Sequence, residues 1–314
     1  MNTRALSLPA THGLTYAKML VAMFFWGGIW VTGRIIAQEV QAPIAAAALR
    51  FAIAALVLAG FLHFSGEGVK APATPLAWLG VIGMGLFGMA IYNVVFFYGL
   101  KEVSAGRGAL LIAFNPVMVA IVAWTIGGER WRLVHLLGAA TAMYGCLMVL
   151  GNGDPWAMLR GAVSVAEWMV LSCVVLWTLY TFLGRWTTRT LSAMNATLFA
   201  CLTGAVMLGA LAIWQGETDL GSWSWRVWAC VAFLGICGTA IGFSWYSEGV
   251  RVLGAARAAA FINLVPVFAV LQAAVLLGER LSAGVLLGGF VVLLGVWLTN
   301  RPAVAELQQC PPCD

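Results

Sequence analysis

Two prolines lie in the middle of long apolar segments, and each has an asparagine within one helical turn. The pairs are Asn115 with Pro116 and Asn263 with Pro266. A proline inside a helix removes one backbone hydrogen bond and kinks the helix, and a carbonyl freed in an apolar medium needs a partner or a cavity. We expect the kinks to act as moving parts, to face each other and to coordinate the polar head of a small solute, such as an ammonium group. The alternative is that the prolines only bend helices for packing and that each asparagine bonds to a neighbouring helix.

Aromatic residues with adjacent hydrogen-bonding groups recur in the first and third apolar segments of each half of the chain. The first segments contribute Trp26, Trp30, Trp177 and Tyr180, and the third segments contribute Tyr92, Asn93, Ser244 and Trp245. A ring face can stack on an aromatic solute or hold a cation, so this set suits an amphipathic solute. The alternative is packing or lipid contact, because the chain holds 15 Trp residues and many such residues form belts at the membrane surface.

Arg50 is the one basic residue well inside an apolar segment. Ionisable groups in a membrane are costly and are functional candidates by default, so Arg50 is a candidate to attract a substrate carboxylate or to lock a gate to an acidic group. The alternative is that its side chain reaches back to the outer surface. No Asp or Glu lies at the centre of any segment, so we do not expect proton coupling through a central carboxylate. Glu167 and Glu248 are the nearest candidates for a peripheral proton site.

Two Gly-Glu-Arg turns carry Glu129 and Glu279. These carboxylates are expected to cap helices, with salt bridges in a gate as the alternative. Arg107 and Arg257 lie only a few residues inside their segments, and we expect both to extend toward the membrane surface.

The composition indicates which elements must position these residues. Of the 314 residues, 62% are hydrophobic and only 9% are charged, and the mean hydropathy is +0.94. Because a soluble domain carries about 25% charged residues, a soluble enzyme, a nucleic-acid-binding protein and a disordered scaffold are excluded. A crossing needs about 20 apolar residues, so we predict an all-α polytopic membrane protein with ten transmembrane helices. They are expected near 18–38, 43–64, 76–98, 105–126, 132–150, 165–185, 191–214, 225–247, 255–277 and 283–299.

The second half of the chain repeats the first. The pattern Trp26, Gly33, Arg34 recurs 151 residues later, and at an offset of 150 Pro116 matches Pro266. Glycines and the Gly-Glu-Arg turns match at the same offset of 150. We therefore expect a first five-helix repeat over 18–150, a connecting loop over 151–164, a second repeat over 165–299 and a cytoplasmic tail over 300–314. Since five is odd, the second repeat enters the membrane from the opposite side, an architecture typical of secondary transporters.

The orientation follows from the Lys and Arg residues of the loops, which are more abundant on the cytoplasmic side. A cytoplasmic N-terminus places ten of them inside and six outside. We expect a multi-pass protein of the cell inner (plasma) membrane with both termini in the cytoplasm.

The repeated residues resemble the EamA unit of the drug/metabolite transporter superfamily. The start Trp26-Gly-Gly-Ile-Trp30, the triplet Leu49-Arg50-Phe51, Pro116 and the Gly-Glu-Arg turn match it, over roughly residues 20–299. The second repeat lacks the Arg-Phe pair, and Cys201-Leu202 stands at the corresponding place. Within the superfamily the chain looks most like YddG-type amino-acid exporters. The resemblance implies ten helices, cytoplasmic termini and export of small metabolites, with substrates across the family ranging from amino acids to nucleotide sugars.

The sequence predicts a secondary transporter that exports small metabolites, most of all amino acids including aromatic ones, by alternating access. The alternatives are a carrier of drugs or nucleotide-type metabolites, an integral membrane enzyme and a structural membrane protein. An enzyme would need His, Asp or Cys residues clustered at one depth, and the three His are scattered. A GxGxxG pattern at Gly83–Gly88 lies inside an apolar helix, outside the context that dinucleotide binding requires. We expect no cofactor, metal or nucleic acid, a small-molecule substrate and the lipid bilayer as partners, and a chain able to act as a monomer.

Overall fold

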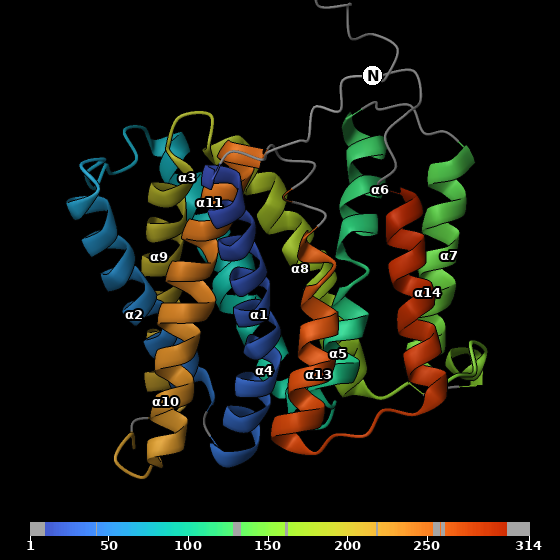
Figure 1. The fold of residues 1–314 in the computed structure, drawn as a ribbon. Helices are drawn as coiled ribbons and strands as arrows, with labels where there is room; N and C mark the ends of the chain where they lie inside the picture. Colours follow the sequence, from blue (N-terminus) through green and yellow to red (C-terminus); the bar gives the residue numbers. More distant parts are fainter. Residues whose placement is uncertain are drawn as a thin grey trace, which may run out of the picture. The chain divides into compact units, whose positions relative to one another are not determined.

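The computed structural model describes residues 10–41, 43–127, 133–160, 163–217, 219–253, 258 and 261–299, and throughout these ranges the regular structure is helical (Figure 1). The helices of the first half are α1 (Ala10–Glu39), α2 (Pro43–Phe64), α3 (Pro75–Met84), η1 (Gly85–Ile91), α4 (Tyr92–Leu100), α5 (Ala105–Ile112), α6 (Asn115–Gly127), α7 (Leu133–Leu150) and η2 (Ala157–Arg160). The second half contains α8 (Val165–Thr187), α9 (Ala193–Trp214), α10 (Trp225–Phe233), η3 (Leu234–Ile241), α11 (Gly242–Leu253), α13 (Val265–Leu277) and α14 (Ala283–Thr299).

Within these described ranges, six helical segments are long and apolar enough to cross a membrane, and four shorter apolar helices accompany them. The long segments are Gly13–Glu39, Pro43–Phe64, Pro75–Leu100, Val165–Thr187, Ala193–Trp214 and Trp225–Leu253. The shorter ones are Ala105–Val119, Leu136–Leu150, Val265–Leu277 and Ala283–Leu298. The all-helical prediction is therefore confirmed, and each apolar helix overlaps one of the ten ranges expected from the sequence.

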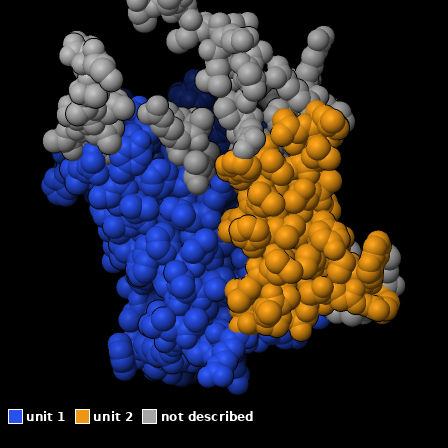
Figure 2. Space-filling view, turned by 45° about the vertical axis from the view of Figure 1, so that its right-hand side comes forward, with its two compact units in different colours: residues 1–112, 164–280 blue, residues 113–163, 281–314 orange. Residues whose placement is uncertain are grey.

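The chain divides into two compact units that do not follow the boundaries of the repeats (Figure 2). Unit 1 comprises Met1–Ile112 and Ser164–Arg280, and unit 2 comprises Ala113–Val163 and Leu281–Asp314. Each unit contains helices from both halves of the sequence.

In unit 1, the helices of one repeat pack against those of the other. The pair α2 and α9 is closely packed, α1 contacts α11 and α13, and α8 contacts α3 and α4. Gly27 makes the contact with α13 possible, because a Cβ atom there would lie 2.7 Å from the Cβ of Phe268. Small residues allow such close approach between membrane helices. The two repeats therefore form one interlocked bundle in this unit.

The third helix of each repeat contains a π-helical segment at the same place. Gly85–Ile91 separates α3 from α4, and Leu234–Ile241 separates α10 from α11, about 150 residues further on. A π segment leaves backbone groups outside the regular helical pattern and is frequent at functional sites. The sequence comparison did not predict these segments, although the first overlaps the glycine pattern at Gly83–Gly88 that was set aside as a dinucleotide motif.

The fourth helix of each half is interrupted at positions 150 residues apart. The interruption lies at Ala113–Phe114, before Pro116, and at Asn263–Leu264, before Pro266. Both breaks agree with the loss of a backbone donor at proline.

In unit 2, α7 and α14 lie side by side (Figure 1). A Cβ atom on Gly145 would lie 2.5 Å from the backbone nitrogen of Val292, and one on Gly288 would lie 2.9 Å from that of Val149. Gly284 likewise meets the backbone of Gly153, at 2.7 Å. Gly284 and Gly288 thus allow close approach between these helices, as small residues do in membrane proteins.

Candidate functional site

Arg50 lies on α2 and is buried, with 6% of its surface exposed. Its Nη1 donates to Oδ1 of Asn93 at 3.1 Å, and its Nη2 donates to Oγ1 of Thr239 at 3.2 Å. Its Nε is buried without a partner. The side chain therefore does not reach the membrane surface, and the snorkelling alternative is wrong for this residue.

The two acceptors of Arg50 are oriented by the π segments next to them. The amide nitrogen of Asn93 donates to the carbonyl of Met89 at 2.8 Å, which turns its oxygen toward the guanidinium. The hydroxyl of Thr239 donates to the carbonyl of Leu234, five residues earlier, at 2.8 Å. Because the single hydroxyl hydrogen is used there, the oxygen is left to accept from Arg50. One guanidinium thus joins the third helices of both repeats.

Among the described residues, no carboxylate forms an ion pair with Arg50. The four described ion pairs involve other cations, namely Lys18, Arg107, Arg160 and Arg226. The guanidinium carbon lies 4.7 Å from the ring centroid of Phe51, a favourable contact that does not neutralise charge. A buried cation without a counter-ion costs several kcal/mol, so the site is suited to an incoming anionic group.

The residue of the second repeat that corresponds to Arg50 is Ala200, which corrects the sequence comparison by one position. Helices α2 and α9 begin and end 150 residues apart. Consistently, a Cβ on Gly235 would approach the carbonyl oxygen of Arg50 at 2.7 Å, and one on Gly85 would approach that of Ala200 at 3.0 Å. Since α2 and α9 pack together, a second arginine at this place would bring two like charges into one buried region.

Four of the nominated aromatic residues belong to one continuous array in unit 1. Trp30 contacts Phe96 at 5.1 Å between ring centroids, Phe96 contacts Tyr92 at 6.0 Å, and Tyr92 contacts Trp177 at 6.1 Å. Trp177 then contacts Tyr180 at 5.2 Å. Tyr92, the middle member of this array, directly precedes Asn93 in the sequence. Phe96 links the array and was not nominated, since nothing in its local sequence distinguishes it from neighbouring phenylalanines.

Trp26, Ser244 and Trp245 lie in a second group, between α1, α11 and α13. Trp26 packs against Phe243 and Tyr246, with ring centroids 5.3 and 5.2 Å apart, and its Nε1 donates to the carbonyl of Gly238 at 3.0 Å. Trp245 stacks on Phe25 at 6.1 Å. The hydroxyl of Ser244 donates to the carbonyl of Ala240 at 2.6 Å. The donor groups of Trp26 and Ser244 are engaged by backbone carbonyls, as packing requires.

The two asparagine–proline pairs fall in different units. Asn115 and Pro116 belong to unit 2, and Asn263 and Pro266 belong to unit 1. Oδ1 of Asn115 is buried without a partner. The expectation that the two kinks face each other stays a prediction.

Glutamates link the repeats at the end of unit 1 where α1 ends, which we term the Glu39 end. The carboxylate of Glu279 accepts from the amides of Ala105 and Gly106, at 2.8 and 3.0 Å, so the expected helix cap is confirmed for this residue. Glu217 accepts from the amide of Ala45 at 2.9 Å. Negative charge is favourable at helix N-termini, and each cap joins the second repeat to the first.

Three ion pairs in unit 1 also cross between the repeats. At the Glu39 end, Glu39 pairs with Arg226 at 2.8 Å. Arg107 pairs with Glu167 there, and the expectation that Arg107 extends toward the membrane surface stays a prediction. At the opposite end, Lys18 pairs with Glu248 at 2.9 Å. Glu129, Arg257 and the neighbouring turns lie outside the described residues.

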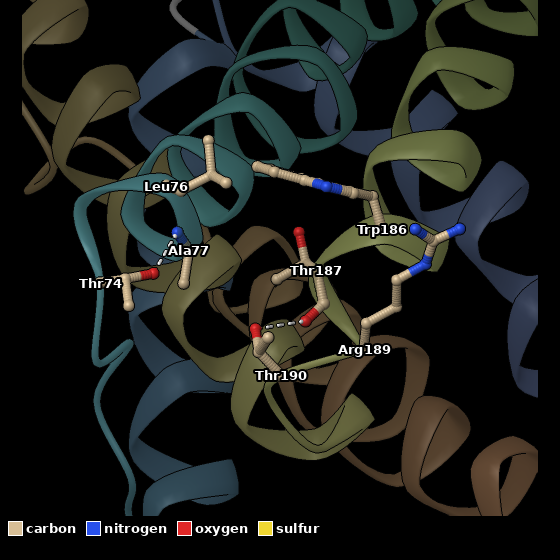
Figure 3. Close-up of a pocket in the computed structure, with 7 residues that line it drawn as sticks. All are labelled: Thr74, Leu76, Ala77, Trp186, Thr187, Arg189 and Thr190. Carbon is tan, nitrogen blue, oxygen red and sulfur yellow. Dashed lines mark hydrogen bonds between the residues drawn. The ribbon is translucent and has the colours of Figure 1, made fainter.

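A shallow pocket lies where α3 begins and α8 ends (Figure 3). Its lining includes Thr74, whose Oγ1 accepts from the amide of Ala77 at 3.1 Å and so caps α3. Thr190 likewise donates to the carbonyl of Thr187 at 3.3 Å. These polar groups are used for helix capping, and none of the nominated residues lines the pocket. In the described part of the chain, no three His, Cys, Asp or Glu side chains are grouped to hold a metal ion.

The long apolar helices and the interlocked repeats define a multi-pass membrane protein. The family model of the EamA-like transporter family matches residues 13–151 and again residues 164–301. The chain therefore belongs to the EamA-like transporter family, and it is a transporter by family.

Relatives with printed names are consistent with this family. The chain is 29% identical to the uncharacterized transporter YyaM of Bacillus subtilis, over 81% of this chain and 83% of the relative. It is 29% identical to a probable terminal-alkyne amino-acid exporter of Streptantibioticus cattleyicolor, over 72% and 74%. A protein of known crystal structure, 22% identical, matches with a TM-score of 0.61 over 91% of this chain and 97% of the other, which supports the fold alone.

Proposed function

We propose that this transporter exports amino acids, including aromatic ones, by alternating access. In this proposal ten helices cross the cell inner membrane and both termini are cytoplasmic. The solute binds beside α2 and the two third helices, in unit 1.

The observation that carries the proposal is the buried Arg50 guanidinium, which has no carboxylate partner among the described residues. A substrate α-carboxylate would supply the missing counter-charge, and two N–H groups of a guanidinium can bind a carboxylate together. The array of Trp30, Phe96, Tyr92, Trp177 and Tyr180 includes the residue that directly precedes Asn93, a hydrogen-bond partner of this group. Its rings offer a surface for an aromatic or apolar side chain.

The interlocked repeats support alternating access. Ionic contacts between the repeats lie at both ends of unit 1: Glu39, Glu167, Glu217 and Glu279 make them at the Glu39 end, and the Lys18–Glu248 pair makes one at the other. Contacts of this kind can be broken and remade as one repeat rocks against the other. Arg50 bonds to the third helix of each repeat, so a relative motion of the repeats would change the surroundings of a solute bound there.

The proposal is tested by counterflow of labelled L-phenylalanine into proteoliposomes preloaded with the unlabelled amino acid. We expect uptake above empty liposomes for the wild-type chain and a loss of at least tenfold for Arg50→Gln. Arg160→Gln is the matched control, because Arg160 lies at the exposed end of η2 and the same charge is removed there.

Equal uptake by Arg50→Gln and Arg160→Gln would contradict the assignment of Arg50. No exchange of any labelled amino acid above empty liposomes would refute amino-acid transport.

A further inference from the structure

We propose that the Arg50 site recognises the carboxylate of its substrate and not the ammonium group, so that the protein also transports aromatic monocarboxylates that lack an amino group. This inference rests on the proposed function and extends it to a further class of substrate. Carboxylates with an arylalkyl tail, such as 3-phenylpropionate, are the class of solute that it adds.

A substrate ammonium in a buried site pairs with a carboxylate of the protein, so the positions of the acidic residues decide whether such a partner is present. The chain has 12 Asp and Glu residues. Nine lie in the described part of the chain, all of them in loops or within a few residues of a helix end: Glu39, Glu67, Glu102, Asp154, Glu167, Glu217, Asp219, Glu248 and Glu279. The other three, Glu129, Glu306 and Asp314, lie outside the described residues.

Most of the described carboxylates are also engaged already. Glu39, Asp154, Glu167 and Glu248 form ion pairs with basic side chains. Glu217 and Glu279 accept from amides at helix N-termini. Among the described residues, the buried guanidinium of Arg50 therefore has no carboxylate as counter-ion. No described carboxylate beside it is available to pair with a substrate ammonium either.

A zwitterion and a monocarboxylate differ in what they leave unpaired in such a site. The carboxylate of either solute forms a neutral pair with Arg50. The ammonium of the zwitterion must also lose water, and burial of a charge without a partner of opposite sign is unfavourable. The faces of Tyr92 and Trp177 can offset part of that cost by cation–π attraction. Removal of the ammonium removes the cost altogether.

The hydrogen-bond acceptors of the site also favour a substrate without an ammonium group. Asn93 Oδ1 and Thr239 Oγ1 already accept from the guanidinium, at 3.1 and 3.2 Å. The donors of both side chains are engaged by backbone carbonyls. Neither group is therefore oriented toward an ammonium in preference to Arg50.

Three matched solutes test the inference: L-phenylalanine, 3-phenylpropionate without the amino group, and 2-phenylethylamine without the carboxylate. Each competes with labelled L-phenylalanine in the proteoliposome counterflow assay at pH 7. We expect 3-phenylpropionate to inhibit at a concentration equal to or below that of unlabelled phenylalanine, and 2-phenylethylamine to need at least tenfold more. Labelled 3-phenylpropionate should also exchange faster in wild-type proteoliposomes than in those with Arg50→Gln, which corrects for passive entry of the weak acid.

The outcomes separate the two proposals. Exchange of phenylalanine with inhibition by the amine, or without inhibition by the acid, would overturn the inference and leave the proposed function intact. No exchange of phenylalanine together with Arg50-dependent exchange of 3-phenylpropionate would refute amino-acid transport and support recognition of the carboxylate. No exchange of either solute would refute both.

The variant Asn93→Asp provides a second test. If Arg50 had only a structural role, this change would not shift the relative inhibition by the acid and the amine. The new carboxylate would stand next to Nη1 of Arg50 and neutralise it from within the protein. We expect inhibition by 3-phenylpropionate to weaken at least tenfold while inhibition by 2-phenylethylamine is retained or strengthened. Equal weakening for both solutes would indicate a disturbed fold and would contradict the assignment.

Discussion

Gly235 offers a way to separate Arg50 from Thr239 without changing either residue. A Cβ atom on Gly235 would lie 2.7 Å from the carbonyl oxygen of Arg50 and 2.9 Å from the Cβ of Ile53. Ordinary contact begins near 3.4 Å, so Gly235→Ala must move η3 away from α2 by about 0.7 Å (3.4 − 2.7). Applied to the 3.2 Å bond between Nη2 and Oγ1, this shift gives about 3.9 Å, beyond hydrogen-bond distance.

The loss of this bond sets the magnitude of the expected effect. A hydrogen bond to a charged group contributes about 1.5–3 kcal/mol. If the solute needs Arg50 held in place, counterflow should fall by roughly 10- to 150-fold, since each 1.4 kcal/mol is about tenfold. Overpacking should also lower the free energy of unfolding by about 1–3 kcal/mol.

The assay compares Gly235→Ala with Gly60→Ala in the same proteoliposomes, with the thermal midpoint in detergent measured for both. Gly60 lies on α2, where an added Cβ meets nothing within 4 Å, so its variant should transport normally. Equal counterflow rates for the two variants would show that the link from Arg50 to Thr239 does not support transport.

Two further predictions concern the helix cap at the Glu39 end and the packing of unit 2. Glu279→Gln weakens the charge-assisted bonds to the amides of Ala105 and Gly106, so the free energy of unfolding should fall by about 1–2 kcal/mol; an unchanged thermal midpoint would contradict a stabilising cap. Gly295→Ala would place a methyl group against the backbone of α7 and should cost about 1–3 kcal/mol, whereas Gly209→Ala on the open face of α9 should be neutral in the same thermal-shift measurement. Equal midpoints for these two glycine variants would contradict the close packing of α7 and α14.

The sequence predicted the helices well because each reflects a long apolar stretch, which composition reveals directly. Helix α2, for example, was expected over 43–64 and runs from Pro43 to Phe64. The internal offset of 150 residues was equally visible, since α9 occupies the corresponding positions Ala193–Trp214. Arg50 was also identifiable from the sequence for a physical reason, because a charged residue inside an apolar stretch is energetically costly and marks a functional candidate.

The partners of Arg50 were harder to predict. Asn93 was nominated for its neighbour Tyr92, and Thr239 was missed, because it lies 189 residues from Arg50 in sequence and its polarity is modest. Trp26 and Trp245 were nominated on residue type, whereas the structure engages them in packing between α1 and α11. Residue type identifies candidates, but only the contacts between repeats separate a packing aromatic from one beside the charge.

The exchange of helices between the repeats in unit 1 has a consequence for biosynthesis. Helix α1 ends at Glu39, and its partner α11 begins at Gly242, 203 residues later (242 − 39). At a synthesis rate of about 5–20 residues per second, α1 waits roughly 10–40 s in the membrane before this partner is made. During that interval its small residues, including Gly27, face lipid or a chaperone instead of α13, which is made later still. The insertion machinery therefore handles the first repeat as an incomplete half, and α1 completes its native contacts only when the second repeat follows.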